Sequence, residues 1–393
     1  MYIYGSLMNI PDNCQRGYIQ VDLSKIRINI HNLHKRTPRF PGIMVVVKSD
    51  GYGHGAVAIA GATEWMDCVY GFAVATSEEA FDLRENGITK PILIMGPVFP
   101  YAYERLINEQ ISIIIYNEET LTLLIECTKR LNKTVSVHLE IDTGMNRVGI
   151  KPDEEGFLFI KKITANKNRN IDGIYTHFTK ADETKLENTI NQLEAFYSFV
   201  DLLENELGLN LRYKHSSNSA GVFALTEQTY INPLNICRAG IASYGIWPSA
   251  ETSEFDPAFE LFPVLSLYSQ IIMLKEVPPG EAISYGGTFI TSRPTKVATI
   301  PIGYGDGYPR SLSNTGHVLI RGNKAPIIGR ICMDFFMVDV TDILDVTIYD
   351  KVTLIGSDGS LKITVEDLSN LSGRFHYEIV CGLGKRLPRI YCE

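Results

Sequence analysis

The sequence has little of what marks membrane, nucleic-acid-binding or disulfide-stabilised proteins. Its apolar runs fall short of the ~20 residues that cross a bilayer, and its first residues lack the charged-then-apolar layout of a secretion signal. A net charge of −8 argues against nucleic acid or an acidic membrane surface as a partner. The seven cysteines are scattered without CxxC spacing, so we expect a reducing cytoplasm, no disulfide framework and no metal site.

What the sequence does have is the composition of a soluble globular protein, with 45% hydrophobic and 21% charged residues. A chain of 393 residues exceeds one ordinary core and predicts two domains. Near residue 250 the pattern changes from apolar runs and amphipathic stretches to short alternating runs punctuated by Gly, Pro and Asp.

The first part of the chain alternates apolar runs with amphipathic stretches such as 77–86, 118–131 and 187–207, whose apolar residues return at three- and four-residue steps. The expected strands are residues 43–48, 69–74, 91–95, 111–116, 134–141, 170–175, 211–215 and 235–238. This α/β pattern predicts a parallel sheet closed into a (β/α)8 TIM-like barrel, although an open doubly wound sheet would use the same elements.

The last part of the chain predicts an antiparallel β domain, preceded by a linker at residues 247–257. The segment 17–23, ahead of the first barrel strand, is expected to pair with this domain. The expected bounds are residues 18–250 for the barrel and 251–393 for the β domain, which the segment 1–17 joins.

Polar side chains collect at the carboxyl ends of the predicted barrel strands, where barrel enzymes hold their active sites. The first strand ends at Lys48 and the fifth runs into a loop ending at Arg147. Strands six, seven and eight lead to His177, His215 and Arg238. A lysine at the tip of an apolar strand is suited to attack an aldehyde as a neutral amine, although an exposed strand-end lysine would fit the same pattern.

A phosphate seat is expected in the loops after strands seven and eight. These loops offer the hydroxyl of Ser219 and the backbone amides of Gly240 and Ile241. The glycine-rich turn GYGHG after Lys48 matches neither a P-loop nor a dinucleotide fingerprint. Arg238 fits either a site residue or an ordinary ion-pair partner.

The segment VVVKSDGYGHG resembles the pyridoxal-phosphate (PLP) lysine motif of the alanine racemases. DTGMNRVG, YTHFTKAD, NSAG, RAGIASYG, ISYGGTF, PIGYGDGYPR, GRICMD and YEIVCGL–RLPRIY resemble the other blocks of this fold type III family, in order, over residues 17–391. The chain is also similar to the racemase part of the serine racemases of vancomycin-resistance systems. The ordered set of blocks is far more specific than any single block.

The resemblance implies a racemase that interconverts L- and D-alanine with two bases and supplies D-alanine for peptidoglycan. Lys48 would carry PLP and act as one base, and Tyr285 would be the opposing base, delivered from the second subunit of a homodimer. Arg238 would lie against the pyridine nitrogen. The positions implied to bind the cofactor are Lys48, Tyr52, His177, Asn218, Ser219, Arg238, Gly240 and Ile241. Arg147 and the Met333 amide would bind the substrate carboxylate, and the supporting or gating positions are Glu140, His215, Tyr304, Arg310, Arg330, Cys332, Asp334 and Lys385.

The chemistry agrees with these roles, because racemisation removes a proton from one face of Cα and returns it to the other. A permanently charged Arg238 disfavours a proton on the ring nitrogen, which should suppress transamination. Without the family match, a cross-strand aromatic residue would be the favoured interpretation of Tyr285.

Three departures from the family pattern bear on the site. Ser49–Gly51 replace the commoner Ala-Asn/Asp-Ala, and Gly51 is expected to loosen the turn beside the cofactor lysine. Glu140 stands where many relatives have a carbamylated lysine, so a carboxylate is built in. Lys385 stands where some members have a pocket-lining tyrosine, which leaves serine or a broader range open beside alanine as the substrate.

Two other classes use related barrels. A PLP-carrier protein would lack the second domain, and Tyr285 and Met333 would then have no purpose. A fold type III decarboxylase would be expected to show an HxGSG-like motif and a late Cys-Asp pair, which HSSNSAG and GRICMD do not match well.

Overall fold

The computed structural model describes residues 15–37, 42–165, 169–225 and 235–393, and they form two compact units. The described residues of 25–51 and 56–262 form the barrel unit, and residues 15–24, 52–55 and 263–393 form the β unit. The main boundary thus lies at residue 262, beyond the expected position at 250, because the expected linker belongs to the barrel unit. It contains the helix α10 (Ala250–Glu254), and the hydroxyl of Ser249 accepts from the Thr252 amide at 3.0 Å.

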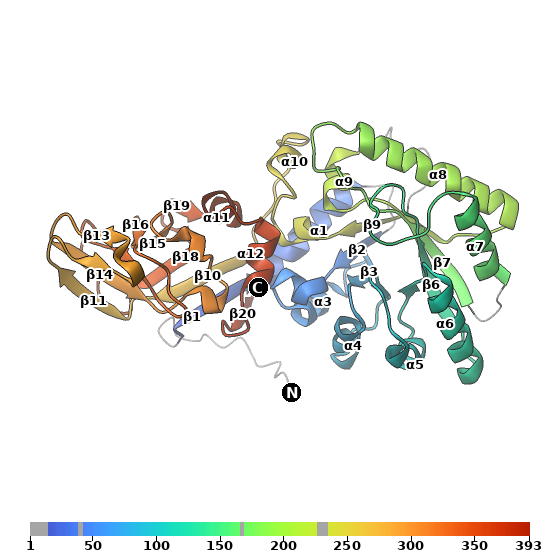
Figure 1. Ribbon diagram of the computed structural model, residues 1–393, viewed down its shortest axis with the longest axis horizontal. Coiled ribbons are helices and arrows are strands. Elements are labelled where there is room, and N and C mark those ends of the chain that lie inside the picture. The colour runs from blue at the N-terminus through green and yellow to red at the C-terminus, as the bar shows by residue number, and fades with distance from the viewer. Residues whose placement is uncertain (1–14, 38–41, 166–168, 226–234) are drawn as a thin grey trace. The chain divides into compact units, whose positions relative to one another are not determined.

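The barrel unit holds eight parallel strands within the described residues, as predicted (Figure 1). They are β2 (Gly42–Val46), β3 (Val69–Val74), β4 (Ile92–Ile94), β5 (Ile113–Ile114), β6 (Val135–Glu140), β7 (Arg169–Tyr175), β8 (Tyr213–His215) and β9 (Ile236–Ala239). Two four-stranded sheets, β4-β3-β2-β9 and β5-β6-β7-β8, meet through a parallel bridge between Leu93 and Ser112. The Asn235 amide, just before β9, donates to the Lys214 carbonyl of β8 at 3.1 Å, and the Arg238 amide of β9 donates to the Ser217 carbonyl after β8 at 3.0 Å. These hydrogen bonds close the ring.

Helices follow the strands, and several begin and end where the sequence predicts. They are α1 (Leu23–Arg36), α3 (Ala56–Thr63), α4 (Ser77–Glu85), α5 (Pro100–Asn108), α6 (Glu118–Leu131), α7 (Glu154–Ala165), α8 (Glu187–Leu207) and α9 (Ser219–Ala224). The side chain of Asn117 caps α6 by accepting from the Thr120 amide at 2.8 Å. Gly208 ends α8 in the left-handed conformation, with φ of 61°.

The β unit is built on one mixed sheet whose pairs are antiparallel except for β1 and β20. Its strand order is β11-β14-β17-β16-β15-β18-β10-β1-β20, with β19 on β18 and a separate β12–β13 pair. The bounds are β1 (Gly17–Asp22), β10 (Leu265–Gln270), β11 (Met273–Val277), β12 (Ala282–Ile283), β13 (Phe289–Ile290), β14 (Thr295–Ile300), β15 (His317–Ile320), β16 (Asn323–Ile328), β17 (Phe336–Asp339), β18 (Lys351–Asp358), β19 (Leu361–Ile363) and β20 (Arg389–Cys392). Two helices, α11 (Val365–Ser372) and α12 (His376–Gly382), complete the unit.

The N-terminal strand belongs to the β unit. β1 pairs antiparallel with β10 and parallel with β20, which confirms the pairing predicted for residues 17–23. This pairing moves the start of the barrel unit from the expected residue 18 to residue 25. Of the segment 1–17 that was expected to join the β domain, residues 1–14 lie outside the described residues.

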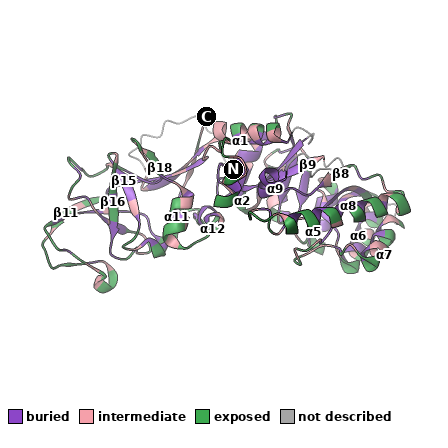
Figure 2. Ribbon diagram, turned by 90° about the horizontal axis from the view of Figure 1, so that it is seen from above, coloured by how far each residue is buried: buried purple, intermediate pink, exposed green. Residues whose placement is uncertain are grey.

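Apolar side chains fill both units. Every residue of β2 and β9 is buried, as parallel strands covered on both faces require, whereas α5 and α8 carry exposed residues (Figure 2). Among the described residues, no helix combines the length and apolar character needed to span a bilayer.

Candidate active site

Lys48 follows β2 and opens a left-handed turn, labelled α2 (Lys48–Tyr52). Ser49, Asp50 and Gly51 have φ values of 56°, 53° and 61°. This conformation costs L-residues roughly 1–2 kcal/mol each but costs glycine almost nothing. Gly51 therefore adopts the left-handed conformation of the turn without the strain that an L-residue would carry.

Two carboxylates hold this turn in place. Glu79 accepts from the Ser49 amide at 2.6 Å and from the Ala75 amide at 2.8 Å. Asp50 accepts from the Ala56 amide at 2.9 Å. The strain beside Lys48 is thus offset by hydrogen bonds to the backbone, as is common where a functional side chain needs a fixed direction.

Arg238, near the end of β9, is a buried cation surrounded by neutral acceptors. Its Nη1 donates to Nδ1 of His215 at 2.7 Å, and its Nη2 donates to the carbonyls of Thr176 and Ser216 at 2.7 and 3.0 Å. Removal from water lowers the pKa of the guanidinium, yet an arginine keeps its proton at neutral pH even so. Its Nε is buried and has no hydrogen-bond partner among the described residues, so a strong donor is left for another acceptor.

The contact with Arg238 fixes the protonation of two buried histidines. Because a guanidinium only donates, Nδ1 of His215 accepts, and a neutral His215 carries its proton on Nε2. That nitrogen lies 3.0 Å from Nδ1 of His138, which accepts in turn. Removal from water, aided by the charge of Arg238, lowers the pKa of His215 and lowers that of His138 to about 3, so both rings are neutral near pH 7.

His138 was not expected from the sequence, and its ring depends on a neighbouring glycine. A Cβ built on Gly173 would lie 2.4 Å from Nδ1 of His138, so no larger residue fits beside this ring. A histidine in the middle of a strand usually indicates a packed core position. The glycine opposite His138 on the neighbouring strand was the sequence feature that could have singled it out.

His177 faces the same cluster from the loop after β7. Its Nδ1 lies 3.4 Å from Nη2 of Arg238. Removal from water and then the charges of Arg238, Arg147 and Lys48 lower its pKa. The structure therefore brings these four predicted residues into one electrostatic neighbourhood at the carboxyl ends of the strands.

The residues expected to hold a phosphate lie on two loops, and the Gly240 amide, which was expected to be free, is bound to one of them, Ser219. The hydroxyl of Ser219 accepts from the Gly240 amide at 2.9 Å and from the Ala242 amide at 3.3 Å. Ile241 opens the 3-10 helix η2 (Ile241–Tyr244) directly after Gly240. The side-chain oxygen of Asn218, which is predicted to bind the cofactor, accepts from the Gly221 amide at 2.9 Å and caps α9.

Glu140, at the end of β6, is buried and makes its closest contact with a tyrosine. Its Oε2 accepts from the Tyr175 hydroxyl at 2.6 Å, whereas its Oε1 lies 3.9 Å from Nη2 of Arg147. The predicted carboxylate beside Arg147 is present, but at the distance of an ion pair and not of a hydrogen bond. Removal from water raises the pKa of Glu140, against the opposing effects of Tyr175 and Arg147.

Tyr175 contacts both the Arg238–His215 pair and Glu140, and it was not expected from the sequence. Its ring stacks on His215, with centroids 4.8 Å apart, and the guanidinium carbon of Arg238 lies 4.8 Å from the ring centroid. Because its hydroxyl also donates to Glu140, this side chain connects Arg238 with the carboxylate that lies beside Arg147. Its place at the end of a barrel strand was the signal that could have identified it.

The remaining predicted residues lie on turns of the β unit. Tyr285 opens the 3-10 helix η3 (Tyr285–Gly287) and is 71% exposed, and Met333 is 53% exposed. The Ser284 hydroxyl donates to the Arg330 carbonyl at 2.6 Å and lies 3.4 Å from Sγ of Cys332. The turns that carry Tyr285 and Met333 are therefore in contact.

A second contact joins the Met333 turn to the turn of Tyr304, in the 3-10 helix η4 (Tyr304–Asp306). The Tyr304 amide donates to the Cys332 carbonyl at 3.1 Å, and the Gly305 amide donates to the Met333 carbonyl at 2.9 Å. Arg310 begins the next 3-10 helix, η5 (Arg310–Leu312), and Lys385 lies exposed between α12 and β20. The predicted site residues thus form one group on the barrel unit and one on the β unit.

Comparison with known proteins identifies the family of the chain. The sequence model of the alanine racemase N-terminal domain matches residues 21–248, and that of the C-terminal domain matches residues 264–391. The alanine racemase of Halothermothrix orenii is 41% identical over 374 residues, which cover 95% of this chain and 96% of that protein. The alanine racemase of Methanococcus maripaludis is 39% identical over 380 residues, covering 95% and 98%.

Solved structures give the same result. The alanine racemase of Clostridium difficile superposes with a TM-score of 0.90 at 36% identity, covering 96% of each chain. The alanine racemase of Bacillus anthracis, solved with bound L-Ala-P, has a TM-score of 0.88 at 32% identity, covering 96% of this chain and 95% of that one. The chain therefore belongs to the alanine racemase family, as an enzyme of the isomerase class.

Proposed function

We propose that this enzyme interconverts L- and D-alanine by a two-base mechanism, with PLP as cofactor and Lys48 and Tyr285 as the bases. The observation that carries the proposal is the buried Nε of Arg238, which has no hydrogen-bond partner among the described residues. A PLP ring nitrogen without a proton is an acceptor of the kind that this donor requires.

The other residues predicted to bind the cofactor suit further groups of PLP. Ser219, Gly240 and Ile241 would hold the phosphate, Tyr52 would contribute its hydroxyl, and Lys48 would bind the cofactor covalently. When bound, PLP supplies the electron sink that makes the Cα proton of an amino acid acidic.

Arg238 would limit how strong that sink becomes. Its charge disfavours a proton on a ring nitrogen that faces Nε. Because His215 and His138 are neutral near pH 7, the positive charge of this cluster lies on Arg238. A weaker sink favours return of the proton at Cα over side reactions such as transamination.

Lys48 and Tyr285 would move the proton on opposite faces of Cα. Racemisation needs a base on each face, since one group cannot both remove a proton from one side and return it to the other. Tyr285 is exposed on its own subunit, which supports its delivery to the site of a partner in a homodimer. Arg147 and the Met333 amide would hold the substrate carboxylate, so that Cα lies between the two bases.

The physiological role proposed is the supply of D-alanine for peptidoglycan in the cytoplasm. Serine is the second candidate substrate, because Lys385 occupies the position of a pocket-lining tyrosine in some relatives.

The test follows α-deuterium exchange of L- and D-alanine in D2O while CO2 is monitored. We expect exchange of both enantiomers without CO2, whereas a decarboxylase would release CO2 and a carrier protein would do neither. Tyr285→Phe should reduce exchange of one enantiomer by about a hundred- to ten-thousand-fold more than that of the other. An equal, small loss for both enantiomers would mean that Tyr285 is only structural.

Two further measurements check the assignments of Lys48 and of the shared site. Borohydride reduction should fix PLP to the peptide that contains Lys48, and labelling of another lysine would overturn the assignment. Mixed Lys48→Ala and Tyr285→Phe chains should regain activity if a site takes residues from two subunits.

A further inference from the structure

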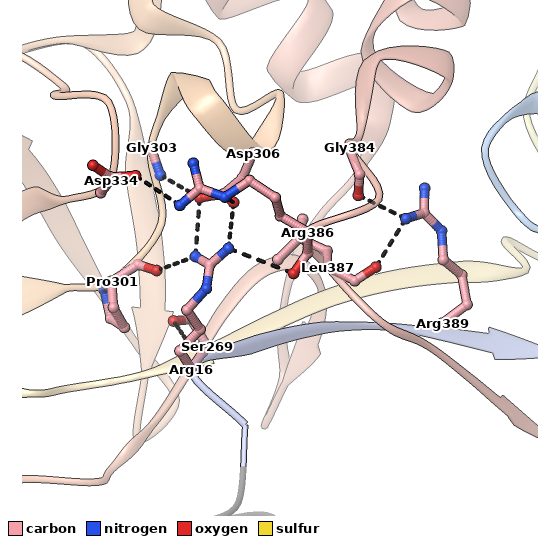
Figure 3. Close-up of polar contacts among 10 residues, drawn as sticks. All are labelled: Arg16, Ser269, Pro301, Gly303, Asp306, Asp334, Gly384, Arg386, Leu387 and Arg389. Carbon is pink, nitrogen blue, oxygen red and sulfur yellow. Dashed lines mark hydrogen bonds and ion pairs between the residues drawn. The ribbon is translucent and has the colours of Figure 1, made fainter.

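Arg386, the residue after Lys385, lies at a junction of three turns in the β unit (Figure 3). Its Nη2 donates to Oδ1 of Asp334 at 2.7 Å, and its Nε lies 3.4 Å from Oδ1 of Asp306. Asp334 directly follows Met333 in the chain. One guanidinium thus links the Met333 turn to a second carboxylate.

Asp306 is the fixed point of this junction. It is fully buried, and Arg16 donates to both of its oxygens, at 2.5 and 3.1 Å. Oδ2 also accepts from the Gly303 amide at 3.1 Å. Arg16 is itself held, because it donates to the Pro301 carbonyl at 2.8 Å, and its hydrogen bond with Asp306 raises its pKa.

Backbone hydrogen bonds bring the same three turns together. The Gly384 amide donates to the Asp306 carbonyl at 2.9 Å, which fixes the start of the Lys385 turn. On the other side, the Tyr304 and Gly305 amides bind the Cys332 and Met333 carbonyls at 3.1 and 2.9 Å.

The contact between the Tyr304 and Met333 turns leaves no space for side chains. A Cβ on Gly303 would lie 2.3 Å from the carbonyl oxygens of Cys332 and Met333. A Cβ on Gly305 would lie 2.7 Å from Nη1 of Arg386 and 3.0 Å from the Met333 oxygen. The backbone of Met333 and the head of Arg386 therefore pack on the same short turn.

We propose that Arg386 is a positioning residue that holds the Met333 turn against Asp306 and fixes the backbone from which Lys385 extends. This inference rests on the proposed function, in which the Met333 amide binds the substrate carboxylate. Arg386 contacts neither substrate nor cofactor in this role, and acts by setting where that amide lies.

The Arg386–Asp334 ion pair is exposed, so its effect on the position of the Met333 turn can be measured without a large effect on global stability. The side chains of Arg386 and Asp334 are 48% and 42% exposed, and ion pairs exposed to this extent contribute little to global stability. Breaking this pair should therefore loosen the junction locally and leave the unfolding transition almost unchanged. Arg386→Met also removes the ion pair with the buried Asp306, but that carboxylate keeps its two hydrogen bonds from Arg16.

The experiment compares Arg386→Met and Asp334→Asn with wild-type protein and with a matched control, Arg293→Met. Arg293 makes an ion pair of the same type with Asp342, with side chains 48% and 76% exposed, and neither residue is among the predicted site residues. Hydrogen exchange of the Tyr304 and Gly305 amides reports the junction directly, because these amides bind the Met333 turn. The second readout is KM and kcat for alanine in the holoenzyme.

We expect amide exchange at Tyr304 and Gly305 to rise about tenfold in Arg386→Met and Asp334→Asn, with no change in Arg293→Met. KM for alanine should rise about tenfold while kcat changes much less, since a displaced carboxylate site weakens binding first. The double variant should be no worse than Arg386→Met alone, because Arg386→Met already removes the contact with Asp334.

Unchanged exchange at these two amides would overturn the junction whether or not the enzyme racemises alanine. Faster exchange with an unaltered KM would overturn the positioning role. A wild-type protein that exchanges no α-proton would refute the proposed function instead, while the amide measurement would still decide on the junction.

Discussion

Nη1 of Arg238 lies 2.7 Å from Nδ1 of His215, and this one contact decides which nitrogen of His215 carries a proton. The consequence extends one residue further, because the Nε2 proton of His215 then needs an acceptor, and Nδ1 of His138 lies 3.0 Å away. The direction of both hydrogen bonds follows from the inability of a guanidinium to accept.

Replacing His138 with phenylalanine should destabilise the protein, because it leaves the buried Nε2 proton of His215 without an acceptor. The expected cost is about 1–3 kcal/mol in the free energy of unfolding. His138→Asn is the matched control, since its amide oxygen can accept near the position of Nδ1. Urea unfolding of cofactor-free protein measures both variants, and equal stability of the two would contradict the role of His138 as an acceptor.

Acid should destabilise the folded protein through the same two histidines. His138 has a pKa of about 3 in the folded chain against 6.5 when unfolded, and that of His215 is also lowered. The unfolded chain therefore binds protons more tightly at these histidines. The contribution of the neutral histidines to the free energy of unfolding is fully present above pH 6.5 and is lost as the pH falls from 6.5 toward 3. Glu140, whose pKa is raised, acts in the opposite direction.

The comparison that isolates His138 is the difference in unfolding free energy between wild type and His138→Asn across this pH range. The contribution of Glu140 cancels in that difference. We expect the wild type to lose stability more steeply with falling pH, and parallel curves would show that His138 does not titrate between pH 6.5 and 3.

Glu140→Gln should weaken the binding of substrate while PLP stays in place. The variant keeps an oxygen that can accept from Tyr175, but it removes the charge that lies 3.9 Å from Arg147. An ion pair at this distance beside a half-exposed arginine is worth about 1 kcal/mol or less, so KM should rise by about fivefold or less. Activity of the wild type should not depend on added bicarbonate, and a bicarbonate response would contradict the built-in carboxylate.

The fold was largely predictable because its elements follow local patterns. Most of the barrel strands are apolar runs, and α6 spans residues 118–131 as predicted because Asn117 caps it and apolar residues repeat along one face. The N-terminal strand was predictable for the same reason. The helix α10 was missed because five residues inside a Ser- and Pro-containing segment give no periodic signal.

Sequence reasoning named the four residues that the structure brings together around Arg238, and it missed the residues that support them. The left-handed turn after Lys48 is imposed by Glu79 and Asp50, and the sequence preferences of Ser49 do not predict it. Arg386 was also missed, because its partners Asp306 and Asp334 lie 80 and 52 residues away in the chain. Contacts at such separations exist only once the sheet has formed.

Lys385→Tyr should change which amino acid the enzyme prefers. The backbone at this position is fixed on one side by the Gly384–Asp306 hydrogen bond and on the other by Arg386, so the replacement changes the side chain and little else. Tyrosine would fill the substrate pocket with a rigid ring, whereas lysine offers a flexible stem and a cationic donor. Any serine activity should fall relative to alanine activity, because the ring removes both the space and the donor for a hydroxyl.

A lost hydrogen-bond partner is worth about 1–3 kcal/mol, so the ratio of kcat/KM for alanine and serine should move at least several-fold. Lys385→Met is the control that separates the two causes, since it keeps the length of the stem and removes the ammonium. A shift in both variants would assign the selectivity to the charge, and a shift in the tyrosine variant alone would assign it to the space. An unchanged ratio in Lys385→Tyr would show that this residue takes no part in choosing the substrate, and the pocket would then be set by the residues shared with the other alanine racemases.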